Sequence, residues 1–209
     1  MENSSIDKNT DKTEKAKVAV LISGGGTNLQ AIIDRWQAGK MPHCEISLVV
    51  SSRRDAYGLQ RAEKAGIPHC FIGKENFEDR LLELLEENGI QIIVLAGFLK
   101  VLSSGFVSRY PERILNVHPS LIPSFCGDGY YGLKVHEAAL ARGVKVSGAT
   151  VHYVNEVTDG GKIIAQKAVE VKDGDTPETL QRRIMEQAEW ILLPEAVEMT
   201  AAGITGGKA

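Results

Sequence analysis

An amide and an imidazole lie two residues apart in the stretch Asn116-Val117-His118-Pro119, at the end of an apolar run. Because side chains alternate faces in an extended strand, we expect Asn116 and His118 on one face and Val117 on the other. Pro119 has no N–H to donate to a sheet, so the strand is predicted to end there. A hydrogen-bond donor and a titratable group therefore meet at the carboxyl end of a strand, where open α/β sheets bind ligands.

A carboxylate for this pair is expected from Asp159, in the turn Asp159-Gly160-Gly161. Glycines allow a tight turn that leans over the strand ends. A carboxylate beside an imidazole favours the charged ring, so Asp159 is predicted to raise the pKa of His118. The three groups together could stabilise an oxyanion and move a proton during attack on a carbonyl carbon. Taken singly, they also suit a strand-end cap, a core histidine and a turn aspartate.

A glycine-rich loop, Ser23-Gly24-Gly25-Gly26-Thr27-Asn28, follows one predicted strand and opens a helix. Such a loop lets the backbone approach an anion, which the free N–H groups of the helix then bind. A nicotinamide-binding fingerprint would place a third glycine at Leu29 and an acid near Arg53. A single phosphate on a small substrate fits better, with a flexible strand-to-helix turn as the structural alternative.

The elements that must position these groups alternate along the chain, which predicts an α/β fold with a doubly wound, mostly parallel sheet. The later apolar runs 144–154 and 162–171, joined by a turn-rich link, predict an antiparallel extension of the sheet. A long C-terminal helix is predicted from Thr176 to about Thr200, with Asp175 or Thr176 as cap and Pro177 in its first turn. The expected strands are 17–22, 46–51, 69–72, 91–96 and 113–117, and the expected helices are 28–38, 58–65 and 77–87.

Composition narrows the class of protein. The 209 residues, 43% of them hydrophobic, suit one large core, and we expect a single domain over 16–202 between flexible tails at 1–15 and 203–209. A net charge of −3 favours neither nucleic acid nor membrane partners. Three widely spaced cysteines indicate neither a disulfide framework nor a zinc site, and a reducing cytoplasm is the expected location.

The chain has a specific resemblance to a known family, which rests on several motifs and their order. These are the glycine-rich loop, Leu95–Leu99, the Asn116–Pro123 block and the Asp159-Gly160-Gly161 turn. It resembles the phosphoribosylglycinamide formyltransferases, folate-dependent enzymes of de novo purine synthesis, over about residues 16–200. The resemblance implies a Rossmann-like formyltransferase fold. It also implies transfer of a formyl group from 10-formyltetrahydrofolate to the amine of glycinamide ribonucleotide, without a metal.

The resemblance also assigns roles by position. The catalytic residues would be Asn116, His118 and Asp159. The substrate phosphate would be held by Gly26, Thr27 and Asn28, and the glycinamide or ribose end would meet Glu189. The residues expected to line the folate pocket are Lys74, Leu99, Lys100, Val101, Leu102, Asn155, Glu156, Val157 and Thr158. Small molecules are the expected partners, and the protein is expected to be a monomer or homodimer.

Two departures from the family pattern stand out. Lys74 occupies a position where many relatives carry arginine, and lysine cannot make the planar two-pronged contact of a guanidinium. The segment 124–132 is longer than the simplest family pattern and suits either a mobile rim over the site or only a longer loop.

Other functions stay open from the sequence. A formyltetrahydrofolate hydrolase and other folate-dependent formyltransferases are the nearest, although their usual extra domains do not fit this short, acidic chain. A hydrolase using Ser120 with His118 and Asp159 lacks a Gly-x-Ser-x-Gly elbow, and a nucleotide-sensing module would not need the catalytic trio. The histidines His43, His69, His136 and His152 are interpreted mostly as structural.

Overall fold

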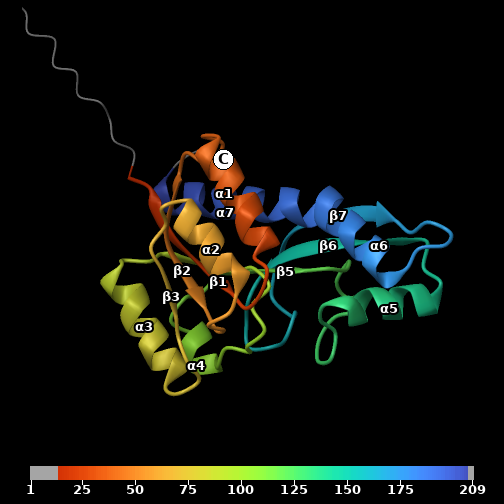
Figure 1. Ribbon diagram of the computed structural model, residues 1–209, viewed down its shortest axis with the longest axis horizontal. Coiled ribbons are helices and arrows are strands. Elements are labelled where there is room, and N and C mark those ends of the chain that lie inside the picture. The colour runs from red at the N-terminus through yellow and green to blue at the C-terminus, as the bar shows by residue number, and fades with distance from the viewer. Residues whose placement is uncertain (1–13, 207–209) are drawn as a thin grey trace, which may run out of the picture.

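One mixed seven-stranded sheet, in the order β3-β2-β1-β4-β5-β6-β7, runs through the protein. The computed structural model describes residues 14–206 (Figure 1). Strands β1 to β5 pair in parallel, and β6 and β7 add to them antiparallel. The strands are β1 (Ala16–Ile22), β2 (Cys44–Ser51), β3 (His69–Phe71), β4 (Ile92–Leu95), β5 (Ile114–His118), β6 (Val146–Tyr153) and β7 (Ile163–Glu170). The predicted fold class, with its antiparallel extension, is confirmed.

Helices cover both faces of the sheet, as the near-continuous apolar strands require. Residues of α1 and α7 pack into one buried cluster, and residues of α3 and α4 pack into a second cluster on the other face. The helices are α1 (Thr27–Gln37), α2 (Tyr57–Lys64), α3 (Phe77–Glu87), α4 (Ser104–Val107), α5 (Leu133–Arg142), α6 (Pro177–Ile184) and α7 (Trp190–Thr205), with a π-helical segment η1 (Met185–Glu189) between the last two. Within residues 14–206, no helix is long and apolar enough to cross a bilayer.

The strand order reverses between β1 and β4. The chain proceeds from β1 to β2 and β3 on one side, and from β4 to β5, β6 and β7 on the other side. In open α/β sheets, this switch point opens a crevice at the carboxyl ends of the strands. The glycine-rich loop follows β1, and the 96–102 segment follows β4. Both segments therefore lie at the same edge as the end of β5, where His118 is the last strand residue.

The C-terminal helix differs from its prediction in two ways. It begins as expected, with Thr176 as the cap, Pro177 in the first turn and a capping box between Thr176 and Thr179, but the π segment then interrupts it. It also continues past Thr200 to Thr205, so the tail predicted from Gly203 is wrong for residues 203–205. Ile204 packs against the core and Gly206 ends the helix in a left-handed conformation. Residues 1–13 and 207–209, which make up most of the predicted tails, lie outside the described residues.

Replacing Gly203 with alanine tests this helix end. A Cβ at this position has no neighbour within 4 Å, so alanine is expected to stabilise the protein by about 0.5–1 kcal/mol through reduced unfolded-state entropy and better helix propensity. Chemical denaturation measures the free energy of unfolding. An unchanged value would contradict a helix that runs through residue 203.

Candidate active site

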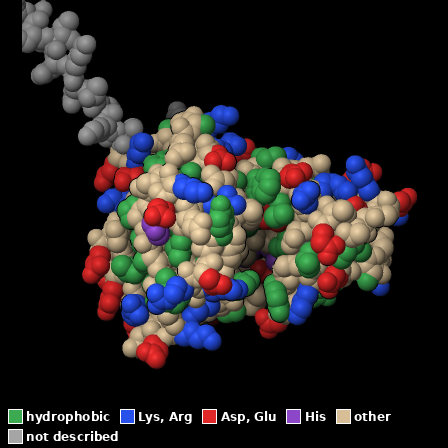
Figure 2. Space-filling model, viewed as in Figure 1, with side chains coloured by type: hydrophobic (Ala, Val, Ile, Leu, Met, Phe, Trp, Pro, Cys, Tyr) green, Lys and Arg blue, Asp and Glu red, His purple; other side chains and the backbone are tan. Residues whose placement is uncertain are grey.

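The amide and imidazole of β5 lie on one face of the sheet, as strand alternation predicts. In the antiparallel pairing with β6, Asn116 lies opposite His152 and His118 lies opposite Thr150. His118 is buried, with 4% of its surface exposed, whereas Asn116 is partly buried. Figure 2 shows a hollow between the part of the molecule built on β1 to β4 and the part built on β6, β7 and α5, with a histidine visible inside it.

Asp159 folds back from the β6–β7 connection onto this pair, as the sequence predicts. One carboxylate oxygen, Oδ2, lies 3.4 Å from His118 Nδ1, and the other, Oδ1, lies 3.6 Å from His152 Nε2. Asp159 adopts a left-handed backbone conformation, with φ of 54°, which aspartate tolerates better than most residues and which is common at functional sites. The structure therefore brings all three predicted catalytic residues together.

Close backbone packing produces this turn. A Cβ on Gly161 would lie 1.7 Å from the carbonyl oxygen of Tyr153, so only glycine allows the returning chain to pass there. Gly160 closes the turn with a hydrogen bond from its N–H to the carbonyl of Val157. The glycines of the Asp159-Gly160-Gly161 motif thus aim the carboxylate.

Main-chain groups of the 124–132 segment hold both His118 and Asp159. The ring Nε2 of His118 donates to the carbonyl of Phe125 at 2.8 Å, and the N–H of Gly127 donates to Asp159 Oδ2 at 2.9 Å. Because a carbonyl only accepts, Nε2 of His118 carries a proton. Any second proton on this ring must go to Nδ1, which faces Asp159.

His152, which the sequence analysis interprets mostly as structural, lies in contact with Asn116 and Asp159. Its Nδ1 donates to the carbonyl of Tyr153 at 2.8 Å, which leaves Nε2 to accept from the Asn116 amide nitrogen at 3.2 Å. His152 therefore fixes the rotation of the Asn116 amide, whose second N–H remains free to donate. The cross-strand register of β5 and β6 creates this pair, and the two strand runs alone do not reveal that register.

The electrostatics of His118 differ from the sequence prediction. Burial lowers the pKa of His118 below its ordinary value, and the nearby charge of Asp159 only partly offsets that effect. The expectation of a raised pKa is therefore wrong, because desolvation of the ring exceeds the attraction of one carboxylate. The lowered pKa favours the neutral form of the His118 ring.

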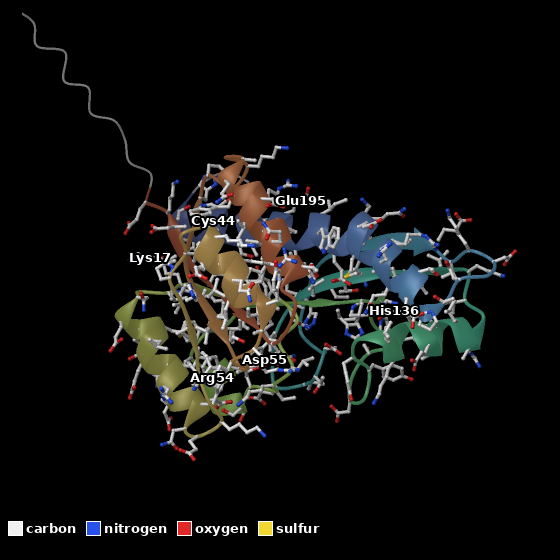
Figure 3. The ribbon with its side chains drawn as sticks, viewed as in Figure 1. Lys17, Cys44, Arg54, Asp55, His136 and Glu195 are labelled. Carbon is white, nitrogen blue, oxygen red and sulfur yellow. The ribbon has the colours of Figure 1, made fainter. Side chains whose placement is uncertain are left out.

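The pKa values of two other ionisable groups here are also lowered, for different reasons. Burial disfavours the charged form of Asp159, but the hydrogen bond from the Gly127 N–H and the nearby His118 ring hold the pKa of its carboxyl below the ordinary value. His136 is a fully buried residue of α5 (Figure 3). Burial lowers the pKa of His136 to about 4, so its ring is neutral.

The predicted phosphate loop has the geometry that an anion site needs. Gly26 is left-handed, with φ of 70°, and α1 begins after it without a side-chain cap, so its first N–H groups stay open to an anion. A Cβ on Gly26 would lie 2.7 Å from Gly58 Cα in α2. Ser23 ties the loop to the segment after β4, since its N–H donates to the Gly97 carbonyl and its hydroxyl accepts from the Leu99 N–H.

Glu189 lies against this loop rather than in isolation. The Asn28 amide donates to the Glu189 carboxylate at 2.7 Å, and both side chains are buried. Burial raises the pKa of Glu189 to about 6. The other amide atom of Asn28, Oδ1, is buried without a partner among the described residues. The π segment that ends at Glu189 also brings Met185 Sδ to 3.9 Å from the Thr27 hydroxyl.

The residues predicted to line a folate pocket lie in three loops. Leu99 and Val101 are 66% and 82% exposed, Val157 is 64% exposed, and Leu102 is buried. Lys100 Nζ lies 4.0 Å from the centre of the Phe77 ring, and Lys74 is exposed in the β3–α3 loop. The remaining residues, Asn155, Glu156 and Thr158, are exposed in the β6–β7 loop.

Ser120 is not arranged as a nucleophile. It is 1% exposed, and its hydroxyl donates to the main-chain carbonyls of Ser124 and Phe125. Among residues 14–206, no group of three or more histidine, cysteine, aspartate or glutamate side chains is arranged to hold a metal ion.

Comparison with known proteins agrees with this geometry. The family described as formyl transferase matches residues 16–197. The chain belongs to the formyl transferase family. The match contains the glycine-rich loop, the β5 pair, Asp159 and Glu189.

Individual relatives of this formyl transferase carry more specific names. The chain is 40% identical over 193 residues to phosphoribosylglycinamide formyltransferase of Haemophilus influenzae, and the match covers 90% of this chain and 88% of that one. It is 46% identical over 200 residues to the trifunctional purine biosynthetic protein adenosine-3 of Gallus gallus, covering 92% of this chain but 19% of that one. The chain thus spans about a fifth of the length of the trifunctional relative.

A solved structure gives the same picture. Glycinamide ribonucleotide transformylase 1 from Symbiobacterium toebii superposes with a TM-score of 0.84 at 41% sequence identity, covering 90% of this chain and 89% of that chain. The expected resemblance to the phosphoribosylglycinamide formyltransferases is therefore confirmed.

Asp159→Asn tests the electrostatic coupling at this site. The carboxylate favours the charged imidazole, so removing its charge is expected to lower the pKa of His118 further. NMR titration of the ring protons measures this pKa. Asp128→Asn is the matched control. Asp128 accepts a hydrogen bond from Thr158, the neighbour of Asp159, but it contacts no imidazole among the described residues. A fall in the His118 pKa of equal size in both variants would contradict the direct coupling.

Proposed function

We propose that this formyl transferase moves the formyl group of 10-formyltetrahydrofolate to the amine of glycinamide ribonucleotide, N1-(5-phospho-D-ribosyl)glycinamide. The products are the N-formyl compound and tetrahydrofolate, in de novo purine biosynthesis. The observation that carries the proposal is the meeting of Asn116, His118 and Asp159 at the end of β5. The names of the relatives support the choice of substrates.

The substrate is proposed to bind between the glycine-rich loop and the π segment. Gly26, Thr27 and Asn28 hold the phosphate, for which the uncapped start of α1 provides N–H donors. Glu189 accepts from hydroxyl or amine donors at the ribose or glycinamide end. Its buried contact with Asn28 couples the two parts of this pocket.

The folate is proposed to bind beside β4 and the β6–β7 loop. Leu99 and Val101, after β4, and Val157, in the loop that carries Asp159, are large apolar side chains left exposed. Exposed apolar groups of this kind mark binding surfaces. Leu102 forms the buried floor of this pocket, while the backbone of Asn155, Glu156 and Thr158 supplies polar contacts. Lys100 and Lys74 add positive charge for the acidic tail of the co-substrate.

The proposed chemistry begins with His118 neutral. The amine attacks the formyl carbon, so that a C–N bond forms and the carbonyl oxygen becomes an oxyanion, which accepts from the free N–H of Asn116. His118 takes up at Nδ1 the proton that the attacking nitrogen loses, and Asp159 stabilises the resulting imidazolium. The proton then passes to folate N10 as the bond from N10 to the formyl carbon breaks. No proton or electron is left over.

Competing functions use the same residues differently. A serine hydrolase is disfavoured because the Ser120 hydroxyl donates to main-chain carbonyls. A formyltetrahydrofolate hydrolase would need the trio but not the phosphate loop. A nucleotide-sensing module would need the loop but not the trio. This chain carries both.

We further propose that the residues from Ala16 to Thr205 act as one catalytic domain. The family match to 16–197 supports this extent. A reducing cytoplasm is the proposed compartment, since Cys44, Cys70 and Cys126 are all free thiols.

Incubation with each substrate alone and with both tests the function. The wild-type protein is expected to consume 10-formyltetrahydrofolate only when glycinamide ribonucleotide is present, measured by the absorbance of the folate and by mass of the product. Consumption of the folate alone would identify a hydrolase, and binding without consumption would identify a sensing module.

His118→Ala is expected to lower kcat by roughly 10²–10⁴-fold while leaving the affinity for the ribonucleotide unchanged. Turnover within tenfold of wild type would contradict the assigned role.

The pH dependence of kcat/KM tests the starting charge of His118. A ring that must accept a proton loses this ability when it is already protonated, so kcat/KM is expected to fall as the pH drops through the lowered pKa, below 6.5. Glu189 has a pKa of about 6, so the profile is also measured in Glu189→Gln to remove its contribution. Activity that rises on acidification toward pH 6 would indicate that the charged ring is the starting form.

A further inference from the structure

Arg61 lies against the back of the proposed phosphate loop. Its Nε donates to the carbonyl of Gly25 at 2.8 Å, and its Nη1 donates to the Gln30 side chain at 2.9 Å. These two contacts connect α2 to the loop and to the first turn of α1. One guanidinium therefore holds the segment on which the phosphate is proposed to bind.

The packing around Arg61 restricts its position further. Its guanidinium carbon lies 5.0 Å from the centre of the Tyr57 ring, and the N–H of Gly58 donates to the carbonyl of Gly24. The first turns of α2 thus bind two successive carbonyls of the glycine loop, Gly24 through the backbone and Gly25 through Arg61. Turning these carbonyls toward α2 leaves the N–H side of the loop for an anion.

The charge of Arg61 has no acidic partner within residues 14–206. Arg35, which lines the same groove of about 460 Å³ as Arg61, Thr27 and Trp190, is by contrast paired with Glu195 at 3.0 Å. Gly26, Thr27 and Asn28 carry no charge of their own. Among the basic side chains of this groove, which also include Lys40, Arg61 is the one that hydrogen-bonds to the glycine loop in the described residues.

We propose that Arg61 is a positioning residue for the substrate phosphate, holding the glycine loop in its anion-binding shape and supplying the balancing positive charge. This inference rests on the proposed function for the identity of the substrate. It does not rest on the chemistry at His118. Arg61 acts on phosphate binding and not on formyl transfer itself.

Binding of ribose 5-phosphate, measured by calorimetry, tests this role without catalysis. Loss of a charged hydrogen-bonding group is expected to weaken binding roughly ten- to a hundredfold in Arg61→Met. Lys64→Met is the matched control: Lys64 lies on the same helix and near the same Tyr57 ring, but it makes no contact with the loop. It is expected to bind within twofold of wild type. Equal affinity of wild type and Arg61→Met would overturn the proposal.

Arg61→Lys separates charge from geometry and serves if the methionine variant fails to fold. Lysine keeps the charge but cannot make the two-pronged contact, so its affinity is expected to lie between those of wild type and Arg61→Met. An affinity equal to wild type would overturn the positioning role, and one equal to the methionine variant would overturn the charge role.

Kinetics completes the test. In formyl transfer, Arg61→Met is expected to raise KM for glycinamide ribonucleotide while KM for the folate and kcat stay within twofold. With the phosphate-free substrate, glycinamide riboside, wild type and Arg61→Met are expected to be equal; an equal loss with both substrates would indicate a merely structural residue. A wild-type protein that binds ribose 5-phosphate through Arg61 but transfers no formyl group would refute the proposed function and leave this inference standing.

Discussion

The balance between burial and attraction at His118 governs the rest of the site. An imidazole with 4% of its surface exposed loses most of the hydration that stabilises its charge, and a single carboxylate at 3.4 Å returns only part of that loss. Burial therefore favours the neutral ring, which lies next to a group that stabilises it once protonated. Such a ring can accept a proton and release it within one reaction cycle. A more exposed ring or a second acid would remove this balance.

Several segments distant in the sequence must be held in place to maintain that balance. β5 presents the ring, the β6–β7 loop returns Asp159, and the 124–132 segment holds both through Phe125 and Gly127. On the neighbouring side, the buried Asn28–Glu189 pair joins the glycine loop to the C-terminal helices. The π segment matters here because its extra residue per turn places Ala188 and Glu189 both in the interior.

Sequence patterns predicted the sheet and most of its helices, since buried parallel strands and amphipathic helices leave strong periodic signals; the helix Phe77–Glu87 was predicted with its observed bounds. Helix α5 was not predicted, because it follows Gly132 without a side-chain cap and turns His136 inward. The three residues proposed as catalytic were predicted from spacing and turn chemistry, and they lie together in the fold. His152 was missed because cross-strand register decides its neighbour, and the pKa direction of His118 was wrong because spacing does not reveal burial.

The contacts that the 124–132 segment makes with His118 and Asp159 come from a carbonyl and an N–H of the main chain. Every amino acid except proline carries both groups. Both contacts therefore depend on the path of the backbone at Phe125 and Gly127, and the left-handed conformation of Gly127, with φ of 86°, favours glycine there. Side chains elsewhere in the 124–132 segment can therefore vary while these two main-chain contacts stay in place.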